Sequence, residues 1–203
     1  DTAAITNAFQ SKGEPLIKYP GALGNFFGDA LERDGFIAFM GPEKRGKTWW
    51  LMDIVWRTML QGKRAAIFEV GDLSQAQIMR RFMIRAAKHP LKAEPVFFPT
   101  SIDHNPDDEY AEVEHEKREF KQGLDDTLAR AACKKVLSKR GRSEDLLKLS
   151  CHPNSSISIH GIRSILQTWE RTGWTPDVVA IDYADILAPI SGIVESRDQV
   201  NAT

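Results

Sequence analysis

The order of apolar and polar positions along this chain predicts alternating strands and helices. Continuous apolar runs of strand length occupy residues 35–40, 64–70 and 178–182. Stripes of apolar residues at helical spacing occupy residues 49–60, 74–88 and 159–171. Because strands and helices follow one another repeatedly, we expect an α/β fold with a mainly parallel sheet flanked by helices on both faces.

Local signals mark where several of these elements begin and end. Ser74 and Gln77 have the spacing of a capping box, which predicts that a helix begins there. Gly62 and Gly173 follow two of the helical stripes and are expected to end them. A further stripe, at i, i+3, i+4, i+7 and i+8, predicts a short amphipathic helix over residues 22–33. Polar residues interrupted by proline and glycine predict an N-terminal arm over residues 1–21.

Residues 99–155 differ in character from the rest of the chain. They are dense in charges of both signs, so we expect a surface insertion with exposed helices over residues 108–121 and 124–138. A short strand is expected at residues 96–98. The insertion contains residue types that bind zinc, but zinc sites usually pair their ligands at short spacings, and scattered polar residues are the favoured interpretation. These candidate ligands are His104, His115, Cys133, Cys151 and His152.

Composition narrows the class of protein without identifying it. The chain has 203 residues, of which 42% are hydrophobic and 27% charged, and its formal net charge is −1. This balance is ordinary for a globular domain and gives no bulk electrostatic signal for nucleic acid. Two cysteines do not make a disulfide framework, no apolar run reaches membrane-spanning length, and no signal peptide is visible. We therefore expect a cytoplasmic protein without membrane contact, and the lack of an initiator methionine suggests a fragment.

One short glycine-containing stretch carries the most specific chemical signal. It matches the pattern G-x-x-x-x-G-K-[ST] and lies between the apolar run at residues 35–40 and the helical stripe at residues 49–60. Its glycines permit a backbone whose N–H groups surround an anion, and the helix that follows adds its positive dipole end. The sequence therefore predicts a phosphate-binding loop. The loop and the tryptophan that follows it are Gly41, Pro42, Glu43, Lys44, Arg45, Gly46, Lys47, Thr48 and Trp49.

Two carboxylates near the ends of apolar runs are expected to lie close to this loop. Glu69 stands near the end of residues 64–70, and Asp182 ends residues 178–182. Burying a carboxylate in an apolar sheet costs free energy, so Glu69 is expected to face a polar cleft. The carboxyl edge of a parallel sheet is where α/β proteins bind ligands, and an Asp in this position usually binds Mg²⁺ beside a phosphate loop.

Three segments in this order resemble the RecA-like P-loop ATPase core, in particular the DnaB-type replicative helicases. Residues 41–48 look like the Walker A motif. Residues 68–78 are similar to the helicase stretch in which a strand ending in a glutamate precedes a serine-capped helix. Residues 179–183 resemble Walker B, including the tyrosine after the aspartate. The resemblance covers roughly residues 35–200 apart from the insertion, and it implies one ATPase domain over residues 22–203.

The resemblance implies roles for the matching residues. Lys47 would bind the β and γ phosphates of ATP and take part in catalysis, while Thr48 and Asp182 would hold Mg²⁺. Glu69 would be the general base that activates the attacking water, with Asp185 as the alternative carboxylate. The implied function is ATP hydrolysis in an ATP-driven helicase or translocase that acts on single-stranded DNA as a homo-oligomeric ring such as a hexamer.

Two other functions remain open at this point. One is an ATP-dependent oligomerisation switch or assembly protein that does not move along DNA. The other is a RecA-type recombinase, which the sequence around Glu69 disfavours. Departures from the family, namely Lys44 and Arg45 inside the loop and the long insertion, resemble phage- or plasmid-encoded relatives. The family's remaining strands, its main DNA-binding loop and its trans-acting arginine would lie beyond Thr203.

Overall fold

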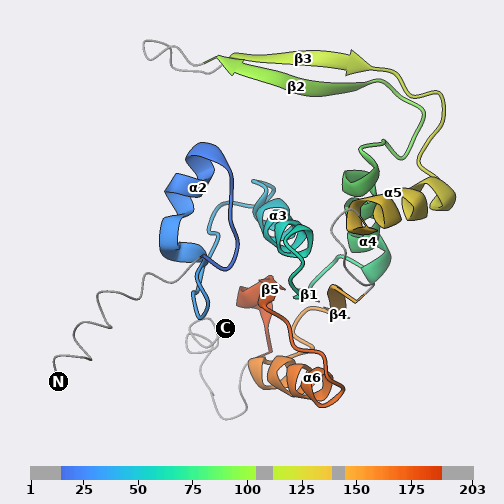
Figure 1. Ribbon diagram of the computed structural model, residues 1–203. Coiled ribbons are helices and arrows are strands. Elements are labelled where there is room, and N and C mark those ends of the chain that lie inside the picture. Colours follow the sequence, from blue (N-terminus) through green and yellow to red (C-terminus); the bar gives the residue numbers. More distant parts are fainter. Residues whose placement is uncertain (1–14, 104–111, 139–144, 189–203) are drawn as a thin grey trace. The chain divides into compact units, whose positions relative to one another are not determined.

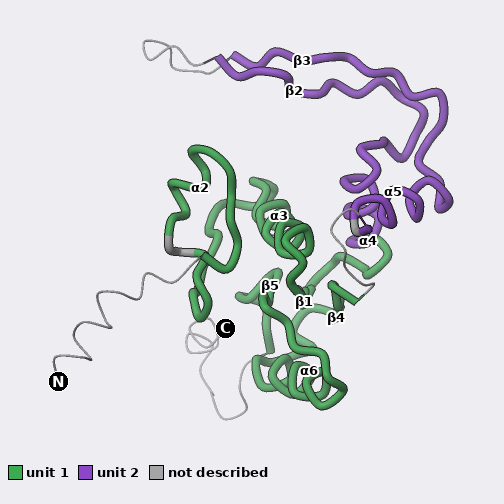
Figure 2. The backbone as a smooth tube through the Cα atoms, viewed as in Figure 1, with its two compact units in different colours: residues 1–77, 140–203 green, residues 78–139 purple. Residues whose placement is uncertain are grey.

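A computed structural model of the chain describes residues 15–103, 112–138 and 145–188. The chain divides into two compact units (Figure 2): unit 1 comprises residues 1–77 and 140–203, and unit 2 comprises residues 78–139. Unit 2 is therefore inserted between two parts of unit 1. Most of the expected N-terminal arm and the candidate zinc ligand His104 lie outside the described residues.

The core of unit 1 is a three-stranded parallel sheet with the strand order β4-β1-β5 (Figure 1). The central strand β1, Ala65–Val70, has all of its residues buried. On either side, β4, Leu147–His152, and β5, Val178–Asp182, pair with it in parallel. The prediction of an α/β fold with a parallel sheet flanked by helices is confirmed at this level.

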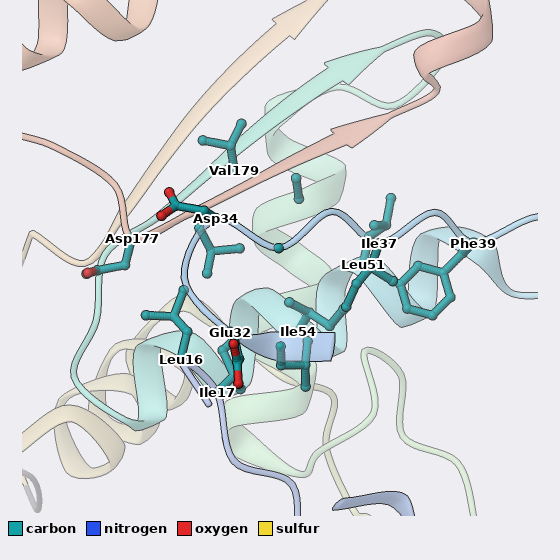
Figure 3. Close-up of a pocket in the computed structure, with 14 residues that line it drawn as sticks. Leu16, Ile17, Glu32, Asp34, Ile37, Phe39, Leu51, Ile54, Asp177 and Val179 are labelled. Carbon is teal, nitrogen blue, oxygen red and sulfur yellow. The ribbon is translucent and has the colours of Figure 1, made fainter. Parts of the chain in front are cut away.

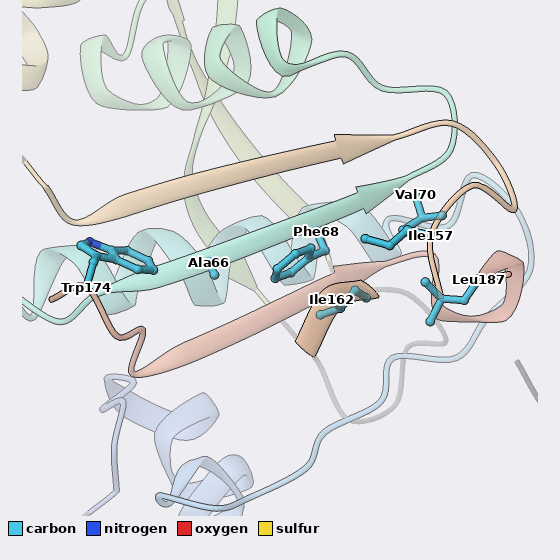
Figure 4. Close-up of a cluster of buried hydrophobic side chains, with 7 residues drawn as sticks. All are labelled: Ala66, Phe68, Val70, Ile157, Ile162, Trp174 and Leu187. Atoms are coloured by element: carbon cyan, nitrogen blue, oxygen red, sulfur yellow. The ribbon is translucent and has the colours of Figure 1, made fainter. Parts of the chain in front are cut away.

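Side chains alternate along β1 between two helical layers. Ala66, Phe68 and Val70 face α6, Ile159–Arg171, where they form an apolar cluster with Ile162 and Trp174 (Figure 4). The alternate positions, which include Glu69, point to the opposite face, because successive side chains of a strand alternate. Helix α3, Lys47–Leu60, contacts β1 and β5 there. The face that carries Glu69 is thus the face that carries the helix after the phosphate loop.

Three helices begin and end close to their expected positions. The capping box at the start of α4, Gln75–Ala87, is formed: the Ser74 N–H donates to Gln77 Oε1 at 2.7 Å, and the Gln77 N–H donates to Ser74 Oγ at 3.3 Å. Gly62 and Gly173 follow α3 and α6 with φ of 73° and 80°. Both glycines take the left-handed conformation that commonly ends a helix.

An N-terminal strap, residues 15–20, packs against α3. The Lys18 N–H donates to Gln61 Oε1 at 2.9 Å, and Gln61 Nε2 donates to the Lys18 carbonyl at 3.0 Å. The Tyr19 hydroxyl donates to Asp53 Oδ2 at 2.8 Å. The strap continues into α2, Gly21–Phe27, and the 3₁₀-helix η1, Gly28–Leu31. The helix expected over residues 22–33 is therefore shorter and changes type at Gly28, whose φ is 45°.

The strand expected at residues 35–40 is not found. This segment has no regular secondary structure and does not join the described sheet. Phe36 and Met40 are 91% and 93% exposed, whereas Ile37 and Phe39 pack on the apolar cluster beneath α2 and α3. The alternation typical of a strand is therefore present, but a neighbouring strand that would satisfy the backbone is not found among the described residues.

Two further expectations fail within residues 99–155. The helix expected over residues 108–121 is wrong, since its described part forms the strand β3, Glu112–Arg118, which pairs antiparallel with β2, Val96–Asp103. Residues 147–152, which were expected in the insertion, form β4 of the central sheet. The helix expected over residues 124–138 is confirmed as α5, Asp126–Ser138.

Candidate active site

The expected phosphate loop is a solvent-exposed turn that leads directly into α3. Residues 41–45 are exposed, and α3 begins at Lys47 with Gly46 as its N-cap residue. Gly46 has a φ of 89°, a conformation that favours glycine. Lys44 also lies in the left-handed region, with a φ of 59°, and nothing in the structure explains a lysine there. The loop therefore ends at a helix N-terminus, the arrangement that suits a phosphate group.

The Lys47 side chain is held by two contacts. Its ammonium group donates to the Gly41 carbonyl at 2.8 Å and lies 5.5 Å from the centre of the Tyr183 ring. The first contact joins the two ends of the loop, and the second joins the loop to the residue that follows β5. Lys47 therefore bridges the two segments that the sequence identified as Walker A and Walker B candidates.

Glu69 and Asp182 lie side by side in the sheet. Their positions are register partners on β1 and β5, so their side chains leave the same face of the sheet. Their exposed fractions are 1% and 5%, which makes both carboxylates buried. Glu69 Oε1 accepts a hydrogen bond from the Leu73 N–H at 3.3 Å. Two buried acidic groups in adjacent positions are costly in an apolar sheet and are typical of a functional site.

A cavity of about 550 Å³ opens between the loop and the end of β5. Its lining includes Gly41 and Lys47 on one side and Asp182, Tyr183 and Asp185 on the other. A cavity of this size falls in the range that holds small ligands. The structure thus brings the loop lysine and the Walker B candidate to one cavity, whereas Glu69 lies one strand away and does not line it.

A smaller cavity of about 150 Å³ adjoins this one (Figure 3). Ile37, Phe39 and Leu51 line both cavities, as does Val179 of β5. In Figure 3 the first three side chains lie together, and Val179 lies across the cavity from them. The residues shared by the two cavities are therefore apolar, whereas the smaller cavity also carries Glu32, Asp34 and Asp177 and the larger one also carries Lys47 and Asp182.

Cys151, which is partly buried, extends the row of Glu69 and Asp182 to the third strand. It is the register partner of Glu69 on β4, so Cys151, Glu69 and Asp182 form one row across the sheet. Burial, together with the negative charge of Glu69, raises the pKa of the Cys151 thiol. The next residue, His152, lies on the other face, where its Nε2 is 2.7 Å from Ser150 Oγ and partial burial lowers its pKa.

Sequence reasoning placed Cys151 among zinc candidates and missed this position. The signal was available, because residues 147–152 alternate between apolar or weakly polar positions at 147, 149 and 151 and polar ones between them. Within the described residues no group of three or more His, Cys, Asp or Glu is arranged to hold a metal ion. The expected magnesium ligands, the Thr48 hydroxyl and the Asp182 carboxylate, are hard oxygen donors of the kind that bind Mg²⁺ together with substrate phosphates.

Comparison with known proteins adds no assignment. No known protein family, curated protein or solved structure matches this chain. Among the described helices, none has both the length and the apolar character needed to cross a membrane.

Proposed function

We propose that this chain binds a nucleoside triphosphate, most simply ATP, at residues 41–48 and hydrolyses it. The observation that carries the proposal is the cavity that Lys47 and Asp182 share, with Glu69 beside Asp182 in the sheet. An exposed glycine loop at a helix N-terminus, a lysine and two carboxylates are the parts that phosphoryl transfer requires.

Lys47 would leave the Gly41 carbonyl and bind the β and γ phosphates. Both of its present contacts, the carbonyl and the Tyr183 ring, attract a cation and are replaceable by phosphate oxygens. A magnesium ion bound with the nucleotide would neutralise charge on the phosphate oxygens, and the Thr48 hydroxyl and the Asp182 carboxylate are the ligands this chain offers. These contacts would hold the triphosphate between the loop and the end of β5.

Glu69 is the proposed general base. In the reaction, water attacks the γ-phosphorus, the bond from this phosphorus to its bridging oxygen breaks, and ADP leaves with that oxygen. The proton of the water passes to the Glu69 carboxylate. Adjacent strands lie about 4.8 Å apart, so Glu69 is one strand spacing from Asp182, which lines the cavity where the γ-phosphate would lie. Asp185, which is exposed and lines the cavity, is the alternative base.

Substitutions in the loop test the proposed ATP binding, and substitutions of the carboxylates test the proposed general base. Lys47→Ala should abolish ATP binding measured by calorimetry, while the matched change Lys44→Ala in the same loop should retain it. Glu69→Gln should bind ATP normally and lose turnover by roughly 10²-fold or more, a typical contribution of a general base. Full ATPase activity in Glu69→Gln would exclude Glu69 as the base, and loss of activity in Asp185→Asn instead would assign the role to Asp185.

We also propose that this ATPase belongs to a RecA-like motor of the DnaB type. The support is the order of residues 41–48, 68–78 and 179–183 along the chain, together with the adjacency of β1 and β5 in the sheet. Such a motor would act as a homo-oligomeric ring that moves on single-stranded DNA. The test is ATPase activity with and without single-stranded DNA at several salt concentrations. Stimulation by DNA supports the motor, and its absence at every salt concentration supports the oligomerisation switch.

A further inference from the structure

Glu69 lies close to the cavity of the candidate site without lining it. Its side chain is only 1% exposed, whereas a general base has to come within hydrogen-bonding distance of the water that it activates. The carboxylate is nevertheless near the end of β1, because Glu69 Oε1 lies 3.7 Å from the position that a Cβ atom at Gly71 would occupy. For Glu69 to act in hydrolysis, a neighbouring group therefore has to move away from it.

Two side chains that follow β5 border the same space beside Gly71. Ile186 Cδ1 and Tyr183 Cδ2 lie 3.5 Å and 3.8 Å from the position of the absent Cβ atom. These are ordinary van der Waals distances, so the space has room for about one methyl group. The absent side chain of Gly71 thus leaves a small gap that the Glu69 carboxylate shares with the Tyr183 ring and the Ile186 side chain.

The two side chains differ in how firmly they are held. Ile186 is partly buried and packs against the apolar cluster that contains Phe68. Tyr183 is 37% exposed and lines the cavity, and the Lys47 ammonium group lies 5.5 Å from the centre of its ring. Cation–π contacts at exposed sites are weak, so the Tyr183 ring can move with a small loss of free energy. Tyr183 is therefore the movable side chain that borders both the cavity and the gap beside Glu69.

We propose that Tyr183 is a positioning residue that couples nucleotide binding to the exposure of Glu69, an inference that rests on the ATPase function proposed above. In the present arrangement the ring holds the Lys47 ammonium group and separates the gap beside Glu69 from the cavity. When phosphates bind Lys47, the ring loses its cation, and phosphate oxygens repel the negative face of the ring. The ring then moves away and opens the gap to water, so Glu69 accepts a proton only while a nucleotide is bound.

The contact between Tyr183 and Lys47 also has a consequence for affinity. Because the ring competes with phosphate oxygens for the Lys47 ammonium group, its removal should strengthen nucleotide binding. We expect Tyr183→Leu to lower the Kd for Mg²⁺ and β,γ-imido-ATP several-fold, as measured by calorimetry. Tyr183→Phe keeps the aromatic ring and should restore the original Kd. A purely structural role of Tyr183 would instead make Tyr183→Leu bind more weakly or leave its affinity unchanged.

The reactivity of a thiol at position 69 tests the covering of Glu69 directly. The full chain carries Glu69→Cys together with Cys133→Ala and Cys151→Ala, and a second version adds Tyr183→Ala. Both versions react with methyl methanethiosulfonate, a small uncharged reagent, with and without Mg²⁺ and β,γ-imido-ATP. We expect nucleotide to accelerate labelling of the first version several-fold, and we expect the second version to react rapidly under both conditions. Tyr183→Phe in place of Tyr183→Ala should restore slow labelling without nucleotide.

Two results of the labelling experiment would overturn the role of Tyr183. Equally slow labelling in the Tyr183→Ala version would show that the ring does not cover position 69. A labelling rate of the first version that nucleotide does not raise would show that binding does not open the gap. Calorimetry on each version separates the two proposals, because a chain that binds no nucleotide contradicts the ATP site itself, whereas binding without faster labelling contradicts only the role of Tyr183. Circular dichroism checks that each variant is folded.

Discussion

Two apolar segments of equal length lead to the two halves of the candidate site, and they differ completely in how they are held. β1 leads to Glu69, lies between two strands and is buried throughout. Residues 35–40 lead to Gly41 and the phosphate loop, but they join no described strand and leave Phe36 and Met40 exposed. Glu69 is therefore held in place by the sheet, whereas the segment that leads to the phosphate loop is held only by the packing of a few side chains.

The difference shows that an apolar run becomes a strand only when neighbours satisfy its backbone. Both segments carry residues that favour strands, so propensity does not separate them. β1 has hydrogen-bonding partners on both sides, whereas residues 35–40 are held by Ile37 and Phe39 on one face only. Substitutions along the two segments should therefore have graded effects on the stability of unit 1. All five tryptophans belong to unit 1, so tryptophan fluorescence in urea reports its unfolding.

Phe68→Ala should produce the largest effect. The Phe68 side chain is fully buried and stacks on Trp169 with ring centres 5.5 Å apart. Its removal leaves a cavity in the centre of the sheet, and we expect unit 1 to lose about 3–5 kcal/mol of unfolding free energy. Phe97→Ala in unit 2 is the control and should leave the tryptophan-detected transition unchanged. A loss below about 1 kcal/mol would contradict the central position of β1.

Phe39→Ala should have an intermediate effect. Phe39 stacks almost parallel on Trp50, with ring centres 5.7 Å apart and an interplanar angle of 7°, and it is only half-buried. We expect a loss of about 1–2 kcal/mol together with a red shift of the tryptophan emission in the folded state. A loss as large as that of Phe68→Ala would mean that residues 35–40 are held as firmly as β1.

Phe36→Ser should change the stability of unit 1 by less than about 0.5 kcal/mol, because the Phe36 side chain is 91% exposed. The measurement is the same urea titration. Destabilisation above about 1 kcal/mol would show that residues 35–40 have a packing partner in solution, and the contrast with β1 would then disappear.

The smallest expected effect is a pH dependence of the stability of unit 1, caused by His152 at the end of β4. Partial burial lowers the pKa of His152, so the folded chain favours the neutral imidazole more than the unfolded chain does. The unfolded state then binds the proton more readily, and the stability of unit 1 should fall as the pH drops below the ordinary histidine pKa of about 6.5. His152→Gln should flatten this dependence, whereas the exposed His160→Gln should not. An unchanged pH profile in His152→Gln would exclude this contribution.

Sequence patterns predicted the parts of unit 1 whose signals are local. The capping box at Ser74, the start of α3 at Lys47 and the strands that carry Glu69 and Asp182 all follow from short motifs or continuous apolar runs. The loop lysine and Asp182 were expected at one cavity, and the structure places them there. Each of these features depends on a few neighbouring residues, which is why the sequence alone was sufficient.

The features that were missed depend on distant partners. Residues 112–118 contain three Glu, one Lys and one Arg, residues that suit a helix by propensity, but pairing with β2 makes them a strand. The alternation in residues 147–152 was overlooked because the charged residues before them suggested one continuous insertion. The position of Glu69 outside the cavity, and of Cys151 beside it, follows from strand order, which no local pattern specifies.

The insertion of unit 2 between β1 and β4 has a consequence for synthesis on the ribosome. Ala65 pairs with Leu147 and Val178, about 80 and about 110 residues later in the chain. At typical translation rates of about 5–20 residues per second, β1 emerges roughly 5–20 s before its second neighbour exists. The hairpin of unit 2, whose strands are close in sequence, can form during that interval. Until β5 emerges, the apolar strand β1, which is buried throughout in the folded chain, has an unpaired edge, the kind of edge at which strands aggregate.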